Sequence, residues 1–386
     1  MSKKNMIEHF SIIRDPRVNR TRKHNLIDIL VIAVCGFLCK CETWVDIEEY
    51  GLSNIDWLTK ILKLENGIPS HDTFGRVFQK IDPIFFNKAF YAWVKDHFEI
   101  NDGEVIAIDG KYFRATASDG NSIPRPRDTL GSVNAWATKA GVALAQKRAD
   151  FQNCSEIKVF RELIGIIDVK NCTVTMDAAG CNSETLNAVV DKGGDYCVTL
   201  KKNQKIIYRE SSDLFDRNKD NIDFFETSNK GHDREENRKY ESLNIDDDFK
   251  VLLEKRAQRK GTGHIKKIKS ITRVTSIRKS RYKSSSQERY YLSSLNANAE
   301  ELASIIRSHW HIENKLHWTL DVAFNEDKST VRRGNGSENM SLLRKFCLNL
   351  IKKETSSKRS VNGKRLKCCW QKEYLLKVIY GTVLEI

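Results

Sequence analysis

Hydrophobic positions in the first hundred residues recur at the spacing of helices. Between Leu26 and Phe37 an apolar residue returns every three or four positions, and the segments 74–81 and 85–93 repeat this spacing. That period is typical of a helix with one buried face. Glycine and proline residues separate the segments, as expected at helix ends. The pattern predicts an all-α N-terminal domain over residues 1–100.

From about residue 104 the pattern changes to short runs of β-prone residues. Alternation of apolar and polar positions predicts strands, and helix-like stretches at 156–165 and from Ser183 interrupt them. The β-prone runs lie at 105–109, 133–138, 142–151, 172–177 and 195–200. Strands that alternate with helices predict an α/β domain, a mixed sheet flanked by helices. We place this domain at residues 101–352.

Residues 201–290 are more polar and predict an insertion in the sheet domain. Their β-prone runs include ESLNI at 241–245, FKVLL at 249–253 and ITRVTSI at 271–277. We therefore expect a β-rich, basic insertion. Residues 353–386 follow it as a basic C-terminal tail.

The charge of the chain favours a polyanionic partner. Lys and Arg total 65 against 51 Asp and Glu, a formal net charge of +14, and such an excess attracts nucleic acid. The stretch from Lys255 to Lys283 holds twelve Lys or Arg and no acid. A merely solvated face is the alternative, but it usually mixes both signs. We predict a phosphate-contacting surface that includes Lys266, Lys267 and Lys269.

Several classes of protein are not indicated. The ten cysteines are scattered through apolar stretches, which fits reduced thiols and a cytoplasmic location better than a disulfide scaffold. The N-terminus lacks the apolar core of a signal peptide. The most apolar run, 26–39, is shorter than the roughly 20 residues of a membrane span, so no membrane role is expected. A Gly-rich phosphate loop and a nucleophile elbow are both missing.

Two aspartates follow apolar runs in the predicted sheet. Asp109 comes after Val105–Ile108, and Asp177 comes after Val174 and Met176. If their strands are neighbours, the two carboxylates can meet and offer a cation the oxygen ligands it requires. Taken singly, each is more often a turn or cap residue.

Glu313 belongs to a predicted helix over residues 299–320. At about 100° per residue, Glu313 lies within about 20° of Leu302 and Leu320 on the helical wheel. This places its carboxylate on an apolar stripe, where an ionised group needs a partner. That partner is a buried cation or a metal ion shared with Asp109 and Asp177. Arg307 is on the other side of the wheel.

Three carboxylates of this kind suit a pair of divalent metal ions in phosphoryl transfer. One ion activates the attacking water or 3′-hydroxyl and the other stabilises the leaving oxygen, so no protein nucleophile is required.

Five blocks of the sequence resemble a known family. They are DPRVNRTRKHNLIDIL at 15–30, GIPSHDTFGRVF at 67–78, AIDGKYFR at 107–114, TMDAAGCN at 175–182 with DYCVTLKKNQ at 195–204, and SHWHIENKLHWTLDVAFNED at 308–327. Together they cover nearly the whole chain. They are similar to insertion-sequence DDE transposases with a ribonuclease H-like domain, in the branch of the H-repeat-associated proteins.

The resemblance implies a function and a site. Asp109 and Asp177 match the first two acids of the family, and Glu313, within its W-x-I-E pattern, matches the third. The implied activity is metal-dependent cleavage at insertion-element ends and strand transfer into target DNA. The implied cofactor is Mg²⁺, with Mn²⁺ as a substitute. The implied partner is double-stranded DNA, namely terminal inverted repeats and target DNA, bound by a homodimer in the bacterial nucleoid. The N-terminal domain matches the family's associated domain, which suggests a DNA-binding or assembly role.

Further residues are candidates for DNA contact. Lys111 and Arg114 follow Asp109 closely enough to position a phosphate, although Lys111 fits an exposed turn nearly as well. Trp310 and Trp318 flank Glu313; core packing is the favoured interpretation and base stacking the alternative. His309 stands where the wider group has Arg. The remaining candidates are Lys202, Asn203 and Arg307, with Gln204 as a companion of Asn203.

Two other functions stay open. The first is a catalytically impaired descendant of a transposase, which would keep the positive charge that binds DNA but would no longer cleave it. A nuclease without strand transfer would cut and not join. Asp321, Glu326 and Asp327 are rival acids to Glu313, and the helical wheel disfavours Asp321.

Overall fold

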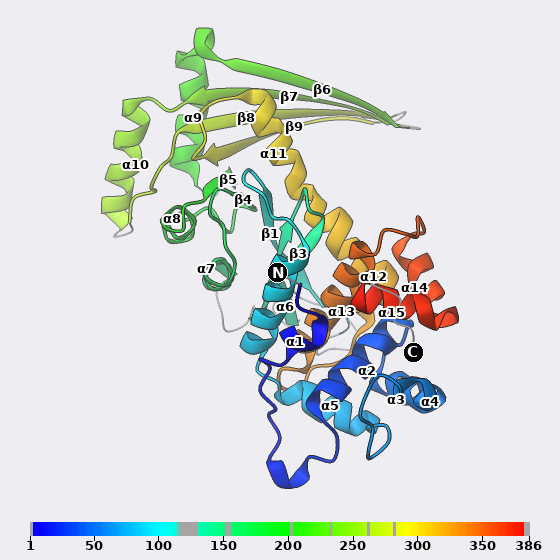
Figure 1. Ribbon diagram of the computed structural model, residues 1–386. Coiled ribbons are helices and arrows are strands. Elements are labelled where there is room, and N and C mark those ends of the chain that lie inside the picture. The colour runs from blue at the N-terminus through cyan, green and yellow to red at the C-terminus, as the bar shows by residue number, and fades with distance from the viewer. Residues whose placement is uncertain are drawn as a thin grey trace.

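The computed structural model describes residues 3–113, 115, 130–150, 156–200, 204–231, 234–260, 263–280 and 283–381. Figure 1 shows one long sheet with a group of helices gathered at one end of it. Among the described residues, no helix combines the length and the apolar character that crossing a membrane requires.

The N-terminal region is helical, as predicted. Its helices are α1 (Met6–Phe10), α2 (Leu26–Leu38), α3 (Trp44–Ser53), α4 (Ile55–Leu58), α5 (His71–Lys80) and α6 (Pro83–His97), with a short 3-10 turn η1 (Asn19–Thr21). Asn25 and Asp82 cap α2 and α6 by accepting a bond from a first-turn N–H, which satisfies a donor that the helix leaves unpaired. Every residue of α2 except Ile27 is buried, so α2 is the core of this region.

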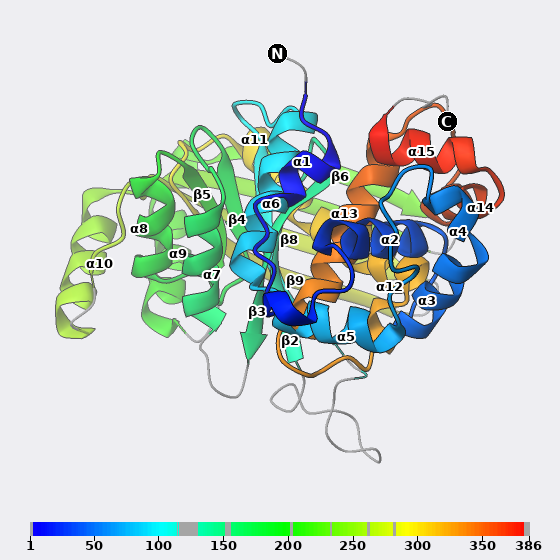
Figure 2. The same ribbon diagram turned by 60° about the horizontal axis from the view of Figure 1, so that its bottom comes forward.

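The C-terminal segment is not a tail. It forms the end of α13 (Gly336–Lys353), then α14 (Val361–Trp370) and α15 (Lys372–Tyr380), and these helices pack against α2, α5 and α6. Figure 2 shows them on the same side of the molecule as α2 and α3. Arg365 is fully buried and donates to the backbone oxygens of Phe37 and Ala323. The prediction of a basic tail is wrong because its cations alternate with apolar residues that fill this core.

The sheet has nine described strands, in the order β3-β2-β1-β4-β5-β9-β8-β7-β6. β1, β2 and β3 form an antiparallel meander, β4 and β5 run parallel to β1, and β9 returns antiparallel to β5. Their bounds are β1 (Val105–Tyr112), β2 (Leu130–Ala137), β3 (Val142–Asp150), β4 (Thr173–Met176), β5 (Asp195–Leu200), β6 (Asp223–Gly231), β7 (Arg234–Asn244), β8 (Ser270–Ser280) and β9 (Lys283–Ser293). The mixed sheet with flanking helices is therefore confirmed.

Helices cover the sheet between its parallel strands. α7 (Glu156–Ile166) joins β3 to β4, and α8 (Ser183–Asp191) joins β4 to β5, as parallel strands require a crossover. The expected helices at 156–165 and from Ser183 are these two.

The segment 201–290 continues the same sheet through four long strands. It also holds α9 (Lys205–Arg217), a 3-10 turn η4 (Lys219–Asn221) and α10 (Asp247–Lys260). FKVLL at 249–253 lies in α10 and is not a strand. Three aspartates at 246–248 precede it, and Asp246 accepts a bond from the Phe249 N–H, which favours a helix start over a strand.

A long helix crosses the sheet after β9. It consists of α11 (Ala299–His311), a six-residue π-helical turn η5 (Ile312–His317) and α12 (Trp318–Phe324), and a 3-10 turn η6 (Glu326–Lys328) follows. Asn298 caps α11 by accepting from the Glu301 N–H. Because π turns are rare and occur frequently at functional sites, the position of η5 is informative.

Candidate active site

Asp109 and Asp177 lie side by side at the centre of the sheet. β1 and β4 are parallel neighbours with Ile108 opposite Met176, so the next residue of each strand is an aspartate. Adjacent strands are about 4.8 Å apart. Asp109 is still within β1, opposite Asn134 of β2, whereas Asp177 directly follows β4 and accepts a bond from the Ala179 N–H at 2.8 Å. Both side chains are half-buried.

Glu313 faces the same place from the long helix. A pocket of about 500 Å³ has Asp109, Asp177 and Glu313 in its wall. Its other walls come from β5, α9, β9 and α11, and the polar or aromatic residues among them are Thr175, Thr199, Tyr208, Gln287, Glu288, Arg289, Tyr291, His309 and Trp310. Residues separated by about 200 positions in the chain are thus brought to one pocket, as the three-acid prediction requires.

Two details of the prediction for Glu313 are wrong. Glu313 is exposed and not on a buried stripe, because it belongs to the π turn η5, which departs from 100° per residue. The predicted convergence to metal-bridging distance is not seen either: within the described ranges no group of three His, Cys, Asp or Glu side chains could hold a metal ion. The acids share a pocket without forming one compact ligand cluster.

Two histidines, the half-buried His309 and the buried His317, hold the long helix against the sheet. Nδ1 of His309 lies 3.0 Å from Oγ1 of Thr175, on the strand that leads to Asp177. Nε2 of His317 lies 3.2 Å from Nδ2 of Asn134, and its Nδ1 lies 3.8 Å from Oδ2 of Asp109. Burial lowers the pKa of His309 to about 4, against an opposing effect of Asp177. His309 is therefore neutral at pH 7 and cannot replace the charge of an arginine.

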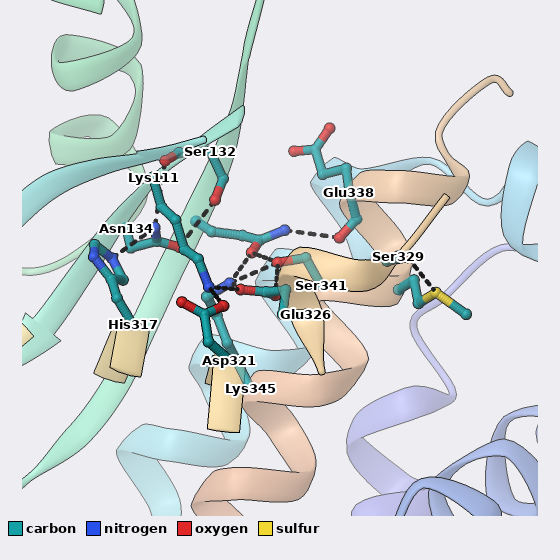
Figure 3. Close-up of polar contacts among 12 residues, drawn as sticks. Lys111, Ser132, Asn134, His317, Asp321, Glu326, Ser329, Glu338, Ser341 and Lys345 are labelled. Carbon is teal, nitrogen blue, oxygen red and sulfur yellow. Dashed lines mark hydrogen bonds and ion pairs between the residues drawn. The ribbon is translucent and has the colours of Figure 1, made fainter. Parts of the chain in front are cut away.

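Lys111 is not a phosphate-positioning residue on the surface. It is buried in β1, and its Nζ bonds Asp321 and Glu326, the latter at 2.8 Å (Figure 3). Burial opposes its charge, but Glu326 and Asp321 raise the pKa of Lys111. Residues two apart in a strand share a face, so Lys111 anchors α12 and η6 beside Asp109. No local pattern predicted this, because the Asp-Gly-Lys run at 109–111 is typical of an exposed turn.

Glu326 joins this ion pair to the helical region. Its Oε1 accepts from Oγ of Ser341 in α13 at 2.7 Å, and Nζ of Lys345 lies 3.7 Å away (Figure 3). Lys345 in turn donates to Gln146 of β3 at 2.6 Å. Burial opposes ionisation of Glu326, but Lys111, Lys345 and Arg344 together hold the pKa of its carboxyl well below the usual range. Asp321 and Glu326, as partners of Lys111, are structural acids and not rivals of Glu313.

Two of the three lysines named in the predicted basic surface form ion pairs. Lys266 pairs with Asp191 at 2.6 Å and Lys267 with Asp195 at 2.8 Å, whereas Lys269 is exposed and has no ion pair among the described residues. Asp195 begins β5, two residues before Cys197 of the pocket wall, and none of the three lysines is itself part of that wall.

The remaining candidates have mixed outcomes. Trp310 is 38% exposed and lines the pocket, and Trp318 is 62% exposed, so the favoured interpretation of core packing is wrong for both. Arg307 is exposed on α11 outside the pocket wall. Gln204 accepts from Arg256 and donates to the Cys181 backbone oxygen. Arg114, Lys202 and Asn203 lie outside the described residues. The nine described cysteines are all free thiols.

Comparison with known proteins gives a consistent answer. A family model described as "Transposase DDE domain" matches residues 100–350, and one described as "DDE_Tnp_1-associated" matches residues 7–94. YhhI of Escherichia coli K12, an H repeat-associated protein named as a candidate transposase, is 34% identical over 100% of both chains. YncI of Escherichia coli O157:H7, also named as a candidate transposase, is 34% identical over 98% of this chain and 95% of its own.

Among solved structures, a piggyBac transposase synaptic complex with hairpin DNA aligns over 98% of this chain and 76% of that chain, with a TM-score of 0.42 and 10% identity. This similarity is too low to establish a shared fold. The family models and the full-length relatives suffice: the chain belongs to the DDE-domain transposases, in the group of the H repeat-associated proteins.

Proposed function

We propose that this chain is a DNA transposase that cleaves insertion-element ends and joins them to target DNA through Asp109, Asp177 and Glu313. One observation carries the proposal: two aspartates stand in register on adjacent parallel strands, and a glutamate from the long helix shares their pocket.

We infer a ribonuclease H-like core for the first five strands. The antiparallel meander β1–β2–β3 followed by the parallel strands β4 and β5 supports this inference. Strands β6 to β9 then form the insertion between the second aspartate and the glutamate. In this arrangement the insertion supplies a wall of the pocket through Gln287, Glu288 and Arg289.

The residues in the pocket fit divalent cations in the chemistry of their donors. Carboxylate oxygens are the ligands that Mg²⁺ and Mn²⁺ prefer, and Asp109, Asp177 and Glu313 would hold the ions. Such ions supply charge neutralisation at the phosphate and activation of the attacking hydroxyl. Since three carboxylates repel one another at short range, their separate positions around one pocket agree with a site that closes as cations and DNA enter.

The other pocket residues act on the DNA. Arg289 brings a positive charge to the wall opposite the aspartates, where it can contact a backbone phosphate. The half-exposed Trp310 offers a ring on which an unstacked base near the cut can stack. His309 and His317 are uncharged at pH 7, so they hold the helix against the sheet without adding a positive charge that would repel metal ions. We propose double-stranded DNA as the partner and a homodimer as the form that acts on it.

A cleavage and joining assay tests the function. Duplexes carrying the DNA that flanks the gene are incubated with the protein and a target plasmid, in Mg²⁺, Mn²⁺ or EDTA. We expect new 3′-hydroxyl ends and joined products in both metals and neither in EDTA. Cleavage without joining would identify a nuclease, and specific binding without cleavage in either metal would identify a non-catalytic descendant. Both results contradict the proposal.

A further inference from the structure

A second pocket lies between the helical region and the segment that follows the long helix. Its volume is about 570 Å³, and it shares no wall residue with the pocket of the three acids. The first turns of α3 and α5 form one side, through Thr43, Trp44 and His71. The segment 328–333 and Arg344 of α13 form the other side.

Arg344 is a buried cation without a polar partner. Its side chain is 2% exposed, and in the described part of the chain its guanidinium makes no hydrogen bond or ion pair, with Nε fully enclosed. Its one aromatic contact is with the ring of Phe37, 5.5 Å away. A guanidinium carries five donors, and burying such a charge without a partner is costly. The guanidinium of Arg344 therefore lacks a hydrogen-bond acceptor among the described residues, and a bound ligand could supply one.

The nearest acids are already used. Glu326 is bonded by Lys111 and Ser341, and Glu42 accepts from the side chain of Asn325. Burial lowers the pKa of Arg344, and these two carboxylates only oppose that effect from a distance.

The rim of the pocket adds positive charge. Arg76, Lys328 and Arg333 are exposed there, against the carboxylates of Glu42 and Asp72.

Resting on the proposed transposase function, we propose that this pocket binds a backbone phosphate of the DNA, with Arg344 at its floor and Lys328 and Arg333 at its rim. A phosphodiester supplies the acceptor oxygens that a guanidinium fork matches. The open rim with exposed cations suits a continuous backbone better than an enclosed small anion.

Two variants and a matched control test the proposal. Lys328→Gln with Arg333→Gln removes two rim charges from exposed positions, and Arg344→Met empties the floor. Lys60→Gln with Lys80→Gln is the control, because both lysines are exposed on the helical region outside the pocket wall. Affinity for an end-containing duplex is measured by fluorescence anisotropy over a salt series, together with thermal unfolding of the free protein.

We expect the rim variant to weaken binding at least tenfold more than the control and to flatten the salt slope by about one unit, since both rim cations contact the same phosphate. Arg344→Met should flatten it by about one unit and leave the melting temperature unchanged or raised, because an unpaired buried charge is removed. Rim and floor variants that bind like the control overturn the proposal, as does an Arg344→Met variant that is destabilised while the rim variant binds normally.

Inorganic phosphate distinguishes the two sources of the anion. If it stabilises the wild type and not Arg344→Met, while the rim variant binds DNA normally, the pocket takes a free phosphate and the DNA assignment is overturned. Cleavage is measured separately on the wild type. A negative result for phosphate binding in this pocket therefore does not affect the test of the proposed transposase function.

Discussion

His309 and His317 sit on the helix that carries Glu313, and burial keeps both uncharged. Burial, together with Lys111 and Lys345, lowers the pKa of His317 to about 3, and the pKa of His309 is about 4. An unfolded histidine titrates near 6.5. Between these values the unfolded chain binds protons that the folded chain does not, so stability falls as the pH drops below about 6.5.

The variant His309→Gln tests this linkage, because the amide can keep the bond to Thr175 without titrating. We expect the wild type to lose about 2 kcal/mol more unfolding free energy between pH 7.5 and pH 5 than the variant does. Denaturant unfolding at both pH values measures the difference. His264→Gln, at an exposed position before β8, is the control and should keep the acid sensitivity of the wild type. Equal losses in wild type and His309→Gln would contradict the assignment.

At the same scale, sequence reasoning placed Asp109, Asp177 and Glu313 at one pocket and misjudged Lys111. An acid after an apolar run can be located from the strand pattern alone. The partners of Lys111 lie about 200 residues later in the chain, and no local pattern can reveal contacts at that separation. For the same reason the exposure of Trp310 could not be inferred.

The helical wheel fails as a predictor in the π-helical turn η5. A wheel at 100° per residue predicted a buried Glu313, whereas the π turn η5 exposes Glu313 and buries Leu316 and His317. Such a turn depends on tertiary contacts, here those of His317 with Asn134 and Asp109. Amino-acid pattern carries little information about it. A short apolar run such as 249–253 can form either a strand or a helix. Here the capping residue Asp246, outside the run, favours the helix.

Arg365 tests whether α14 is part of the core. Its guanidinium bonds the backbone oxygen of Phe37, near the end of α2, and that of Ala323 in α12. Arg365→Ala leaves these carbonyls without donors and should cost about 3 kcal/mol of unfolding free energy. Urea denaturation measures it. Arg359→Ala, at an exposed position just before the same helix, should cost less than about 1 kcal/mol. Equal small effects would restore the tail interpretation.

On the scale of the whole molecule, the +14 net charge correctly indicates nucleic acid but does not say which cations touch it. Lys266 and Lys267 form ion pairs at the surface, and Arg365 is buried and bonds a backbone oxygen. Arg289 beside the acids, and Lys328 with Arg333 at the second pocket, are better placed for phosphates. Charge counts along a chain cannot separate these roles, because ion pairing is settled only when distant elements pack.

In the proposed mechanism Asp109 acts in the chemical step and does not contribute to DNA affinity. Asp109→Asn preserves shape and removes a charged ligand, so cleavage of an end-containing duplex should fall by at least a thousandfold in Mg²⁺. Binding should remain or tighten slightly, since a negative charge near the backbone is removed.

The most direct measurement is therefore the cleavage rate of wild type and Asp109→Asn on the same duplex, at protein concentrations that give equal saturation. We predict cleavage by the wild type and none by the variant. An Asp109→Asn protein that cleaves at the wild-type rate would contradict the three-carboxylate mechanism.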